Sequence, residues 1–331
     1  MPVFALLFLL FSQPVVAKTL PATDFQATHN FINKMVSEHH FNKNELLSIF
    51  SKVNLIVAEK KQKLTAKKTK SKPMSWDKYR SLFITDTRIK NGIEFWKNNL
   101  ETLKRAEKTY NVPQEIIVAI LGIETNYGHN QGKHPVLETL ARLSFGKHRR
   151  KKFYKKELQE FLLMSRENTL APLLIKGSYA GALGYAQFIS SSYRYYAVDF
   201  DFDGKVDLFS SPVDAIGSIA NYFDKHQWHD FGAYARPITL KNSQLKQAKS
   251  STNKPKKNAK YWRSKGFRID SDINDKTKLA FIKLPQDNNS ETWLTFWNFY
   301  VLTRYNHDNR YAMTAVHLSE KLKQQFNLTH P

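Results

Sequence analysis

A single glutamate closes a strongly apolar stretch of the sequence, NVPQEIIVAILGIETNYG at residues 111–128. Pro113 suits the first turn of a helix, and the apolar residues after it recur at helical spacing. Glu124 follows Ile120 and Leu121 by four and three residues, so it lies on the same helical face. Burial on that face raises the pKa of a carboxyl group towards neutrality, as a general acid requires. The alternative is a glutamate that merely ends a helix and pairs with a lysine.

A stretch of small residues, GSYAGALGYAQF at 177–188, has the composition of a binding-site wall. Its glycines and alanines let the backbone approach a ligand or another chain segment closely. Ser178 and Gln187 would supply hydrogen-bonding side chains there. A tightly packed pair of turns without a ligand explains the same composition, so both interpretations stay open.

The acidic loop DFDFDGKVDLF at 199–209 has the spacing of a calcium-binding loop. Positions one, three, five and six are Asp199, Asp201, Asp203 and Gly204. Alternate carboxylates can converge on one cation, and the glycine permits the sharp turn. Position twelve is Ser210 instead of the usual glutamate, so Asp214 is the nearest candidate for the last ligand. An acidic surface turn without metal is the alternative.

Other catalytic patterns find no support in the sequence. No histidine pair has zinc-ligand spacing, no G-x-S-x-G precedes a helix, and no glycine loop has a phosphate-binding pattern. These observations argue against a metallohydrolase, an esterase and a nucleotide-dependent enzyme.

The charge of the chain indicates an anionic partner. The 331 residues include 51 Lys and Arg but only 29 Asp and Glu, a net charge of +22. Nucleic acid, an acidic membrane face and an acidic polymer would all fit this charge. The basic residues concentrate in linker-like segments without interleaved aromatic residues, which argues against nucleic acid.

The first seventeen residues, MPVFALLFLLFSQPVVA, resemble an export signal. The run ends in the small-residue pattern that signal peptidase cleaves, but no Lys or Arg precedes it, so a retained anchor is the alternative. The apolar run is short for a membrane span. The chain has no cysteine, which excludes disulfides, thiol metal sites and a lipid anchor on an N-terminal cysteine.

The chemistry-bearing stretches must be positioned by a mainly α (α+β) fold. Helical periodicity predicts helices at 24–58, 86–104 and 308–323, and KLAFIKL at 278–284 alternates like a strand. We predict four parts from the composition. They are a signal peptide at 1–17, an N-terminal helical domain with a Lys-rich linker at 18–110, a catalytic core at 111–237 and 292–331, and a small β-containing insertion at 238–291.

Four motifs in one order resemble the lytic murein transglycosylase B family. They are VPQEIIVAILGIETNYG, SYAGALGYAQF, DFDGKVDLFSSPVDAIGSIANYF and RYNHDNRYAM, within a match from about residue 25 to 325. The resemblance implies a lysozyme-like helical core with an added helical domain and a small β-containing domain. It also implies action on the glycan strands of peptidoglycan.

By this resemblance Glu124 would be the single catalytic acid and base. It would protonate the oxygen between N-acetylmuramic acid and N-acetylglucosamine and then take the proton of the muramoyl 6-hydroxyl. The product would be a 1,6-anhydromuramoyl end, formed without water. The resemblance implies sugar contacts by Ser178, Gln187, Tyr222, Tyr305, Asn306 and Tyr311. It implies structural Ca²⁺ on Asp199, Asp201, Asp203 and Asp214, and no organic cofactor.

The remaining expectations concern partners and location. We expect a periplasmic monomer that is not a lipoprotein, that is loosely associated with the membrane if at all, and that acts on glycan strands and not on nucleic acid. Cell-wall synthesis enzymes are candidate protein partners. The alternatives to a lytic transglycosylase are a hydrolytic muramidase, which needs a second carboxylate about 5 to 9 Å away, and a non-catalytic peptidoglycan-binding module.

Overall fold

The structure is a computed structural model that describes residues 19–56, 74–229, 232–249 and 253–329. Over these ranges the chain forms fourteen α-helices, one short 3₁₀ helix and eight short strands, which confirms the mainly α prediction. Among the described residues, no helix is both long and apolar enough to cross a membrane. The predicted signal at 1–17 and the Lys-rich linker lie outside the described residues. The chain divides into two compact units, and the predicted domain limits stay a prediction.

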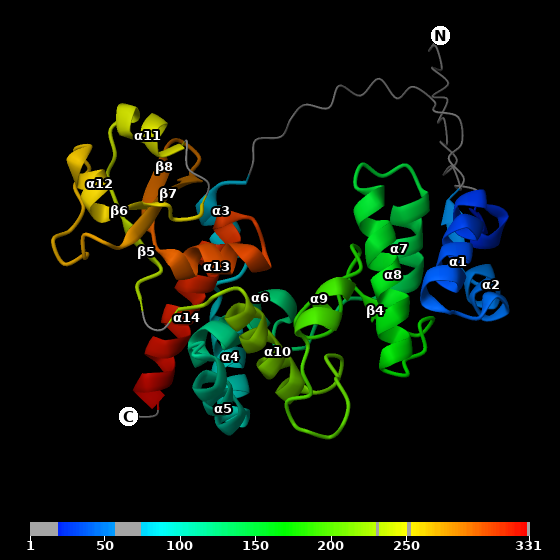
Figure 1. The fold of residues 1–331 in the computed structure, drawn as a ribbon. Coiled ribbons are helices and arrows are strands. Elements are labelled where there is room, and N and C mark those ends of the chain that lie inside the picture. Colours follow the sequence, from blue (N-terminus) through cyan, green and yellow to red (C-terminus); the bar gives the residue numbers. More distant parts are fainter. Residues whose placement is uncertain (1–18, 57–73, 230–231, 250–252, 330–331) are drawn as a thin grey trace, which may run out of the picture. The chain divides into compact units, whose positions relative to one another are not determined.

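The smaller unit comprises the N-terminal helices and residues 137–159 (Figure 1). Its elements are β1 (Thr19–Pro21), η1 (Ala22–Asp24), α1 (Gln26–His39), α2 (Lys43–Ser51), β2 (Asn54–Ile56), most of α7 (Val136–Phe145) and the first half of α8 (Lys151–Glu167). The rings of Phe31, Phe50 and Phe145 meet edge to face at 5.8–6.4 Å and form its core. Asn42 caps α2 by accepting from the backbone N–H of Asn44 at 2.8 Å.

The larger unit begins with three helices. They are α3 (Trp76–Ser81), α4 (Asp86–Asn98) and α5 (Leu100–Tyr110). The single helix predicted over 86–104 is therefore wrong, because the chain bends at Asn99, whose side chain donates to the carbonyl of Phe95 at 2.8 Å. This local bond competes with helix continuation. The N-cap is Thr85, whose hydroxyl accepts from the N–H of Arg88 at 3.2 Å.

Helix α6 (Gln114–Thr125) occupies the centre of the larger unit. Every residue from Ile116 to Ile123 is buried, as expected for a helix that is apolar on all sides. It packs against α4, α5, α10 (Pro212–Lys225) and α14 (Asn309–Thr329) (Figure 1). The predicted helix is present, but Pro113 is its N-cap and not part of its first turn, and Asn111 is the C-cap of α5. The helix predicted over 308–323 is present, although it continues to Thr329.

Short elements connect these helices, and a small sheet carries the rest of the chain. The remaining elements are β3 (His134–Pro135), β4 (Lys176–Gly177), α9 (Ser190–Tyr196), β5 (Ala235–Pro237), α11 (Asn242–Lys249), β6 (Lys257–Asn258), α12 (Ala259–Ser264), β7 (Lys278–Pro285), β8 (Ser290–Thr295) and α13 (Trp297–Tyr305). The strand predicted at 278–284 is confirmed as β7.

The four-stranded sheet is antiparallel with the order β5-β8-β7-β6. Phe281 and Leu294 face each other across β7 and β8, and both belong to a core cluster with Trp262. The opposite sheet face carries Trp293, whose ring meets that of His317 on α14 at 5.7 Å. Each face of the sheet is therefore covered, at least in part, by helices.

Candidate active site

Glu124 lies in the last turn of helix α6, and the chain changes direction sharply directly after it. Asn126, Tyr127 and Gly128 all have positive φ, so the helix cannot continue past this point. A Cβ atom on Gly128 would lie 2.0 Å from the ring of Tyr185, which restricts this position to glycine. The hydroxyl of Thr125 accepts from the N–H of Gly128 at 2.9 Å, and this bond fixes the turn directly after Glu124.

The ring of Tyr127 fits a notch made by two glycines. An added Cβ on Gly92 of α4 would lie 2.3 Å from the Tyr127 hydroxyl, and one on Gly122 of α6 would lie 2.5 Å from it. Tyr127 also stacks on Phe95, with ring centroids 5.6 Å apart. The carboxylate-bearing end of α6 is thus locked against α4 by one buried aromatic side chain.

Glu124 is partly buried and receives one hydrogen bond from a tyrosine. The hydroxyl of Tyr311, in the first turn of α14, donates to Glu124 Oε1 at 2.5 Å. Burial raises the pKa of Glu124 to about 7, and the Tyr311 hydrogen bond opposes this rise because it favours the ionised form. Burial also raises the pKa of Tyr311 well above its usual range, so the phenol keeps its proton. The carboxyl group can therefore both give and take a proton near neutral pH.

Two further predicted tyrosines pack behind this pair. The ring of Tyr305 is nearly parallel to that of Tyr311 at 6.3 Å, and its hydroxyl donates to the carbonyl of Ala186 at 2.5 Å. Tyr222 is buried, contacts the Tyr305 ring at 5.0 Å, and donates to the carbonyl of Arg304 at 2.7 Å. The two hydroxyl groups are thus bonded to the backbone.

A cleft of about 510 Å³ opens in front of Glu124. Its lining comes from Glu124, residues 129–134, Ser178, Tyr179 and Gln187. Among these described lining residues Glu124 is the sole carboxylate. Of the predicted sugar contacts, Ser178 and Gln187 line the cleft, whereas Tyr222, Tyr305, Asn306 and Tyr311 do not. Sequence reasoning missed Tyr179, which is 80% exposed, although it stands within the small-residue stretch.

Hydrogen bonds hold the walls of this cleft. Ser178 accepts from the N–H of Ala182 at 2.9 Å, so its own hydroxyl proton is available to a ligand. Gln187 has a φ of 47° and donates to the carbonyls of Gln131 at 3.1 Å and Gly184 at 2.9 Å. The small-residue stretch is therefore both tightly packed and part of a cleft.

The acidic loop gathers three of its four predicted ligands. Single oxygens of Asp199, Asp201 and Asp203 lie within 4.8 Å of one another. Gly204 has a φ of 88°, and its N–H donates to Asp199 at 2.9 Å. Because three carboxylates at this distance repel one another, a hard cation with oxygen ligands fits the cluster.

Asp214 lies beside this loop in a different environment. It is 1% exposed, and its two oxygens accept from the N–H groups of Phe200 and Asp207, each at 2.7 Å. Burial raises its pKa, and these hydrogen bonds oppose the rise. The carboxylate thus ties the two ends of the loop together. Its role as a calcium ligand stays a prediction.

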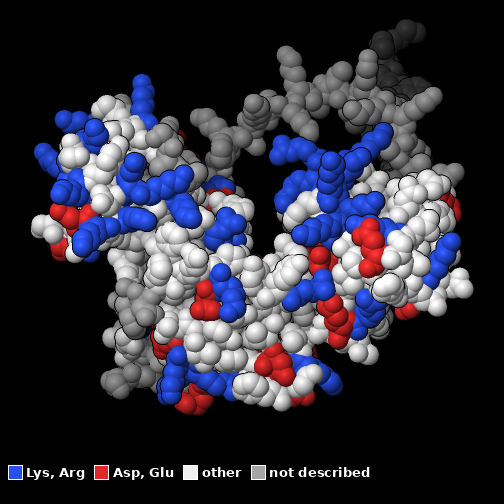
Figure 2. Space-filling model, in the orientation of Figure 1, with Lys and Arg blue, Asp and Glu red and all other residues white. Residues whose placement is uncertain are grey.

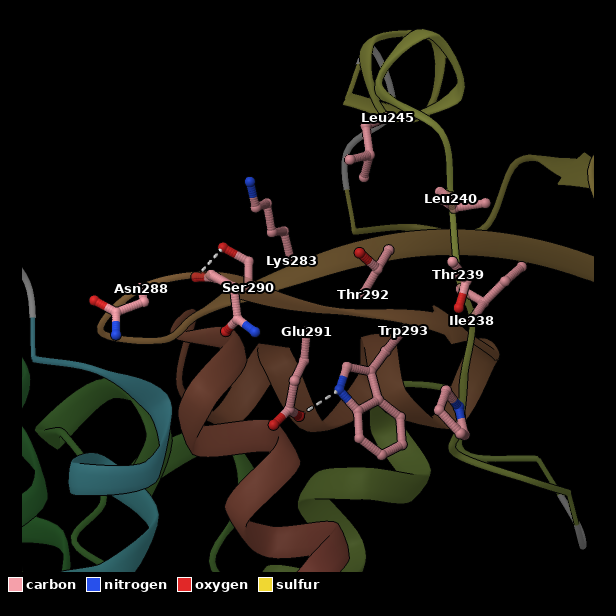
Figure 3. A pocket seen from close by; sticks show the side chains of 12 residues that line it. Ile238, Thr239, Leu240, Leu245, Lys283, Asn288, Ser290, Glu291, Thr292 and Trp293 are labelled. Atoms are coloured by element: carbon pink, nitrogen blue, oxygen red, sulfur yellow. Dashed lines mark hydrogen bonds between the residues drawn. The ribbon is translucent and has the colours of Figure 1, made fainter.

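A second cavity, of about 940 Å³, lies over β8 and the segment after β5 (Figure 3). Lys283 and Thr292 lie on one side of the strands, and Glu291 and Trp293 lie on the other. The carboxylate of Glu291 accepts from Trp293 Nε1 at 3.1 Å and from Gln286 Nε2 at 2.7 Å. This cavity is larger than the Glu124 cleft, but its carboxylate is already engaged by two neutral donors.

Comparison with known proteins gives matches over most of the chain. The family model of the transglycosylase SLT domain matches residues 24–320. Membrane-bound lytic murein transglycosylase B of Escherichia coli K12 is 38% identical over 296 residues, which are 88% of this chain and 81% of that protein.

Solved structures give the same answer. Soluble lytic transglycosylase SltB1 of Pseudomonas aeruginosa has a TM-score of 0.80 at 37% identity, covering 91% of this chain and 99% of that one. The Escherichia coli lytic transglycosylase Slt35 in complex with calcium has a TM-score of 0.78 at 34% identity, covering 95% and 98%. Sequence and fold agree over nearly the whole length, and this chain therefore belongs to the lytic murein transglycosylase B family of peptidoglycan-cleaving enzymes.

Proposed function

We propose that Glu124 is the single acid and base of a water-independent cleavage of the β-1,4 bond between N-acetylmuramic acid and N-acetylglucosamine. The neutral carboxyl group donates its proton to the glycosidic oxygen as the bond from that oxygen to the muramoyl C1 breaks. The carboxylate then takes the proton of the muramoyl 6-hydroxyl, whose oxygen bonds to C1. The 1,6-anhydromuramoyl product forms and Glu124 regains its proton, so the enzyme is ready for another turnover.

The position of Glu124, which is the one carboxylate among the described residues of the cleft and accepts from the Tyr311 hydroxyl, is the observation that carries this proposal, and burial raises its pKa to about 7. One group that serves as acid and then as base works best when its pKa is near the working pH. The attacking hydroxyl belongs to the substrate, so its effective concentration is high and no bound water is needed. The acetamido group of the sugar can stabilise the cationic centre, as in other substrate-assisted glycosidases. A second carboxylate is then unnecessary, in agreement with the residues that line the cleft.

We assign three kinds of role to the other predicted residues. Ser178 and Gln187 line the cleft and bind sugar hydroxyl or acetamido groups, together with the exposed ring of Tyr179. Tyr311 orients Glu124 through its hydrogen bond. Tyr222 and Tyr305 hold the Tyr311 ring in position, because the Tyr305 ring packs beside it, the Tyr222 ring packs against Tyr305, and both of their hydroxyl groups are bonded to the backbone. Asn306 is exposed just before α14 and remains a candidate for an outer sugar contact.

We propose that Ca²⁺ binds Asp199, Asp201 and Asp203 and stabilises the loop, as suggested by the calcium complex of the similar Slt35. The segment that follows these residues reaches the catalytic cleft. The carbonyl of Leu208 accepts from the N–H of Tyr185 at 2.8 Å, and that of Phe209 accepts from Gln131 Nε2 at 2.9 Å. An ordered loop thereby keeps a wall of the cleft in place.

We also propose that the enzyme works in the periplasm, since its substrate lies outside the cytoplasm and residues 1–17 have the composition of an export signal. The similar Escherichia coli enzyme is named membrane-bound. Association with cell-wall synthesis enzymes and a monomeric state remain predictions.

Mass spectrometry of the muropeptides released from purified sacculi tests the proposed chemistry. The wild-type enzyme should release products ending in 1,6-anhydromuramic acid, about 18 Da lighter than hydrolysed ends. Glu124→Gln should retain binding to sacculi and lose cleavage by about 10³-fold or more, because the amide cannot donate a catalytic proton. Glu101→Gln, at an exposed residue of α5, is the matched control.

Two results would contradict the proposal. Reducing ends would make the enzyme a hydrolase that requires a second carboxylate. Cleavage by Glu124→Gln at the wild-type rate would remove the glutamate from the mechanism.

A further inference from the structure

An exposed basic surface stands at the turn between α7 and α8, in the smaller unit (Figure 2). The sequence KHRRKKFYKK, residues 147–156, holds seven Lys or Arg and no acid. Six of these side chains are exposed and form what we name the α7–α8 basic patch: Lys147, Arg149, Arg150, Lys151, Lys152 and Lys156. The seventh, Lys155, is partly buried, with Nζ at 6.0 Å from the centre of the Phe31 ring.

The fold itself does not explain this patch. Within the described part of the chain none of the six cations forms an ion pair, and the acid at position 138 is already paired with Arg142 at 2.7 Å. The first turn of α8 contains no acid. Cations at a helix N-terminus are unfavourable, because the helix dipole places a partial positive charge there. The charges thus oppose one another and the helix, and an external anion would relieve this repulsion.

The form of the patch favours an extended anionic surface over one bound molecule. Its cations are long, exposed side chains, whereas sugar binding uses a few converging groups in a concave site. Contrary to the expectation that the basic residues lie in linker-like segments without aromatic residues, Phe153 and Tyr154 are partly exposed among these cations. The Arg150 guanidinium lies 4.1 Å from the centre of the Phe153 ring. Aromatic rings beside cations suit a bilayer surface, where phosphates and the apolar boundary lie close together.

The N-terminal sequence also favours a membrane as the partner of the basic patch. Residues 1–17 carry an apolar run that is too short to span a bilayer and, if retained, would attach only weakly. Stable attachment to a membrane needs a second signal beside one weak apolar anchor, and a polybasic surface is such a signal. If the apolar run is retained, which is the alternative to cleavage of the predicted signal, it and the basic patch would reinforce each other.

We propose that the α7–α8 basic patch docks the enzyme on an anionic phospholipid bilayer. The patch lies outside the catalytic cleft, so the proposal is independent of the role of Glu124. Docking would hold the enzyme beside the membrane through the smaller unit.

Cosedimentation of the full-length protein with lipid vesicles tests the proposal. The vesicles contain phosphatidylcholine alone or with about 30% phosphatidylglycerol. The test variant replaces the six patch cations by glutamine. The matched variant removes the same charge from six exposed cations of the small sheet region: Lys256, Lys260, Lys265, Arg268, Lys276 and Lys278. Thermal unfolding and the rate on sacculi are measured for each protein.

We expect the wild type to bind the anionic vesicles more tightly than the neutral ones, with binding that weakens as salt rises from about 50 to 500 mM. The patch variant should lose about tenfold or more in affinity, and the matched variant less than about twofold. The patch variant should unfold at the wild-type temperature or above it, because it removes like charges from the start of α8.

Three outcomes would overturn the proposal. Equal binding of the wild type to neutral vesicles would assign attachment to the apolar run alone. Equal losses in the two variants would assign it to net charge. A patch variant that binds vesicles normally but loses binding to sacculi would make the patch a cell-wall contact.

Discussion

The two cavities described above each contain one glutamate, but only one of the two carboxyl groups is suited to proton transfer. The cavity with Glu291 has about 940 Å³, against about 510 Å³ for the cleft with Glu124. Glu291 accepts two hydrogen bonds from neutral side chains, from Trp293 at 3.1 Å and from Gln286 at 2.7 Å. Glu124 ends a helix that is buried on all sides and accepts one hydrogen bond, from Tyr311 at 2.5 Å. The surroundings of the carboxyl group, and not the size of the cavity, mark the reactive site.

The difference originates in the elements that carry the two residues. Helix α6 is apolar on every face, so the residue at its end is partly desolvated and its pKa rises to about 7. Strand β8 alternates between two faces, and Glu291 has polar neighbours within its own hairpin. A carboxyl group has a raised pKa when the element that carries it supplies few hydrogen-bond donors and little contact with water.

Apart from replacement of Glu124 itself, the largest effect on catalysis should come from Tyr311→Phe, which removes the hydrogen-bond donor that the described residues supply to Glu124. We expect kcat to fall about 10- to 100-fold, because the carboxyl group loses its orientation. The lost hydrogen bond favours the ionised form, so the pKa of Glu124 should rise above about 7. The alkaline limb of the kcat/KM profile should therefore move to higher pH. An unchanged limb with reduced kcat would show that Tyr311 acts on the substrate and not on Glu124.

Glu124→Gln should stabilise the fold in a pH-dependent way. The folded protein holds the Glu124 proton up to about pH 7, whereas the unfolded chain releases it near 4.5. The stabilising effect of the raised pKa is complete below 4.5 and is lost as pH rises through 7. At pH 8 the variant should gain at most about 3 kcal/mol over the wild type, and at pH 5 little. Thermal unfolding at both pH values measures this, and a gain equal at both would contradict the buried-acid interpretation.

Removal of calcium should have a moderate effect on stability. With free Ca²⁺ at about 30 times its Kd, chelation should cost about 2 kcal/mol and lower the unfolding temperature by several degrees. Asp201→Asn should abolish this dependence, and Mg²⁺ should not replace Ca²⁺, since it demands a tighter octahedral geometry. The same unfolding temperature in chelator and in calcium would remove the metal from the loop.

The smallest effect should come from Glu291→Gln in the larger cavity. The glutamine keeps an acceptor for Trp293 or Gln286, and no proton transfer depends on it. Release of muropeptides should stay within about twofold of the wild-type rate, as for most substitutions away from special sites. A loss comparable to that of Tyr311→Phe would break the comparison and give the larger cavity a part in the reaction.

Local spacing was enough to predict the position of Glu124 but not its surroundings. The apolar residues of α6 predicted a helix with Glu124 on a buried side, although the helix proved to be buried on every side. Alternation predicted β7, because this signal also lies within one element. The bond from Tyr311 joins residues 187 positions apart, which no local pattern contains, and Tyr311 entered only through the family resemblance. The bend at Asn99 was missed because the apolar period continues across it.

The notch around Tyr127 has a consequence for protein engineering. Replacement of a helical glycine by alanine usually stabilises a protein, because the unfolded chain loses freedom. At Gly92 and Gly122 the same substitution would place a methyl carbon within 2.5 Å of the Tyr127 hydroxyl. In a thermostability screen, substitution of either glycine would therefore displace the end of α6 and change the position of the Glu124 carboxyl group. These two positions should be held fixed in any such library.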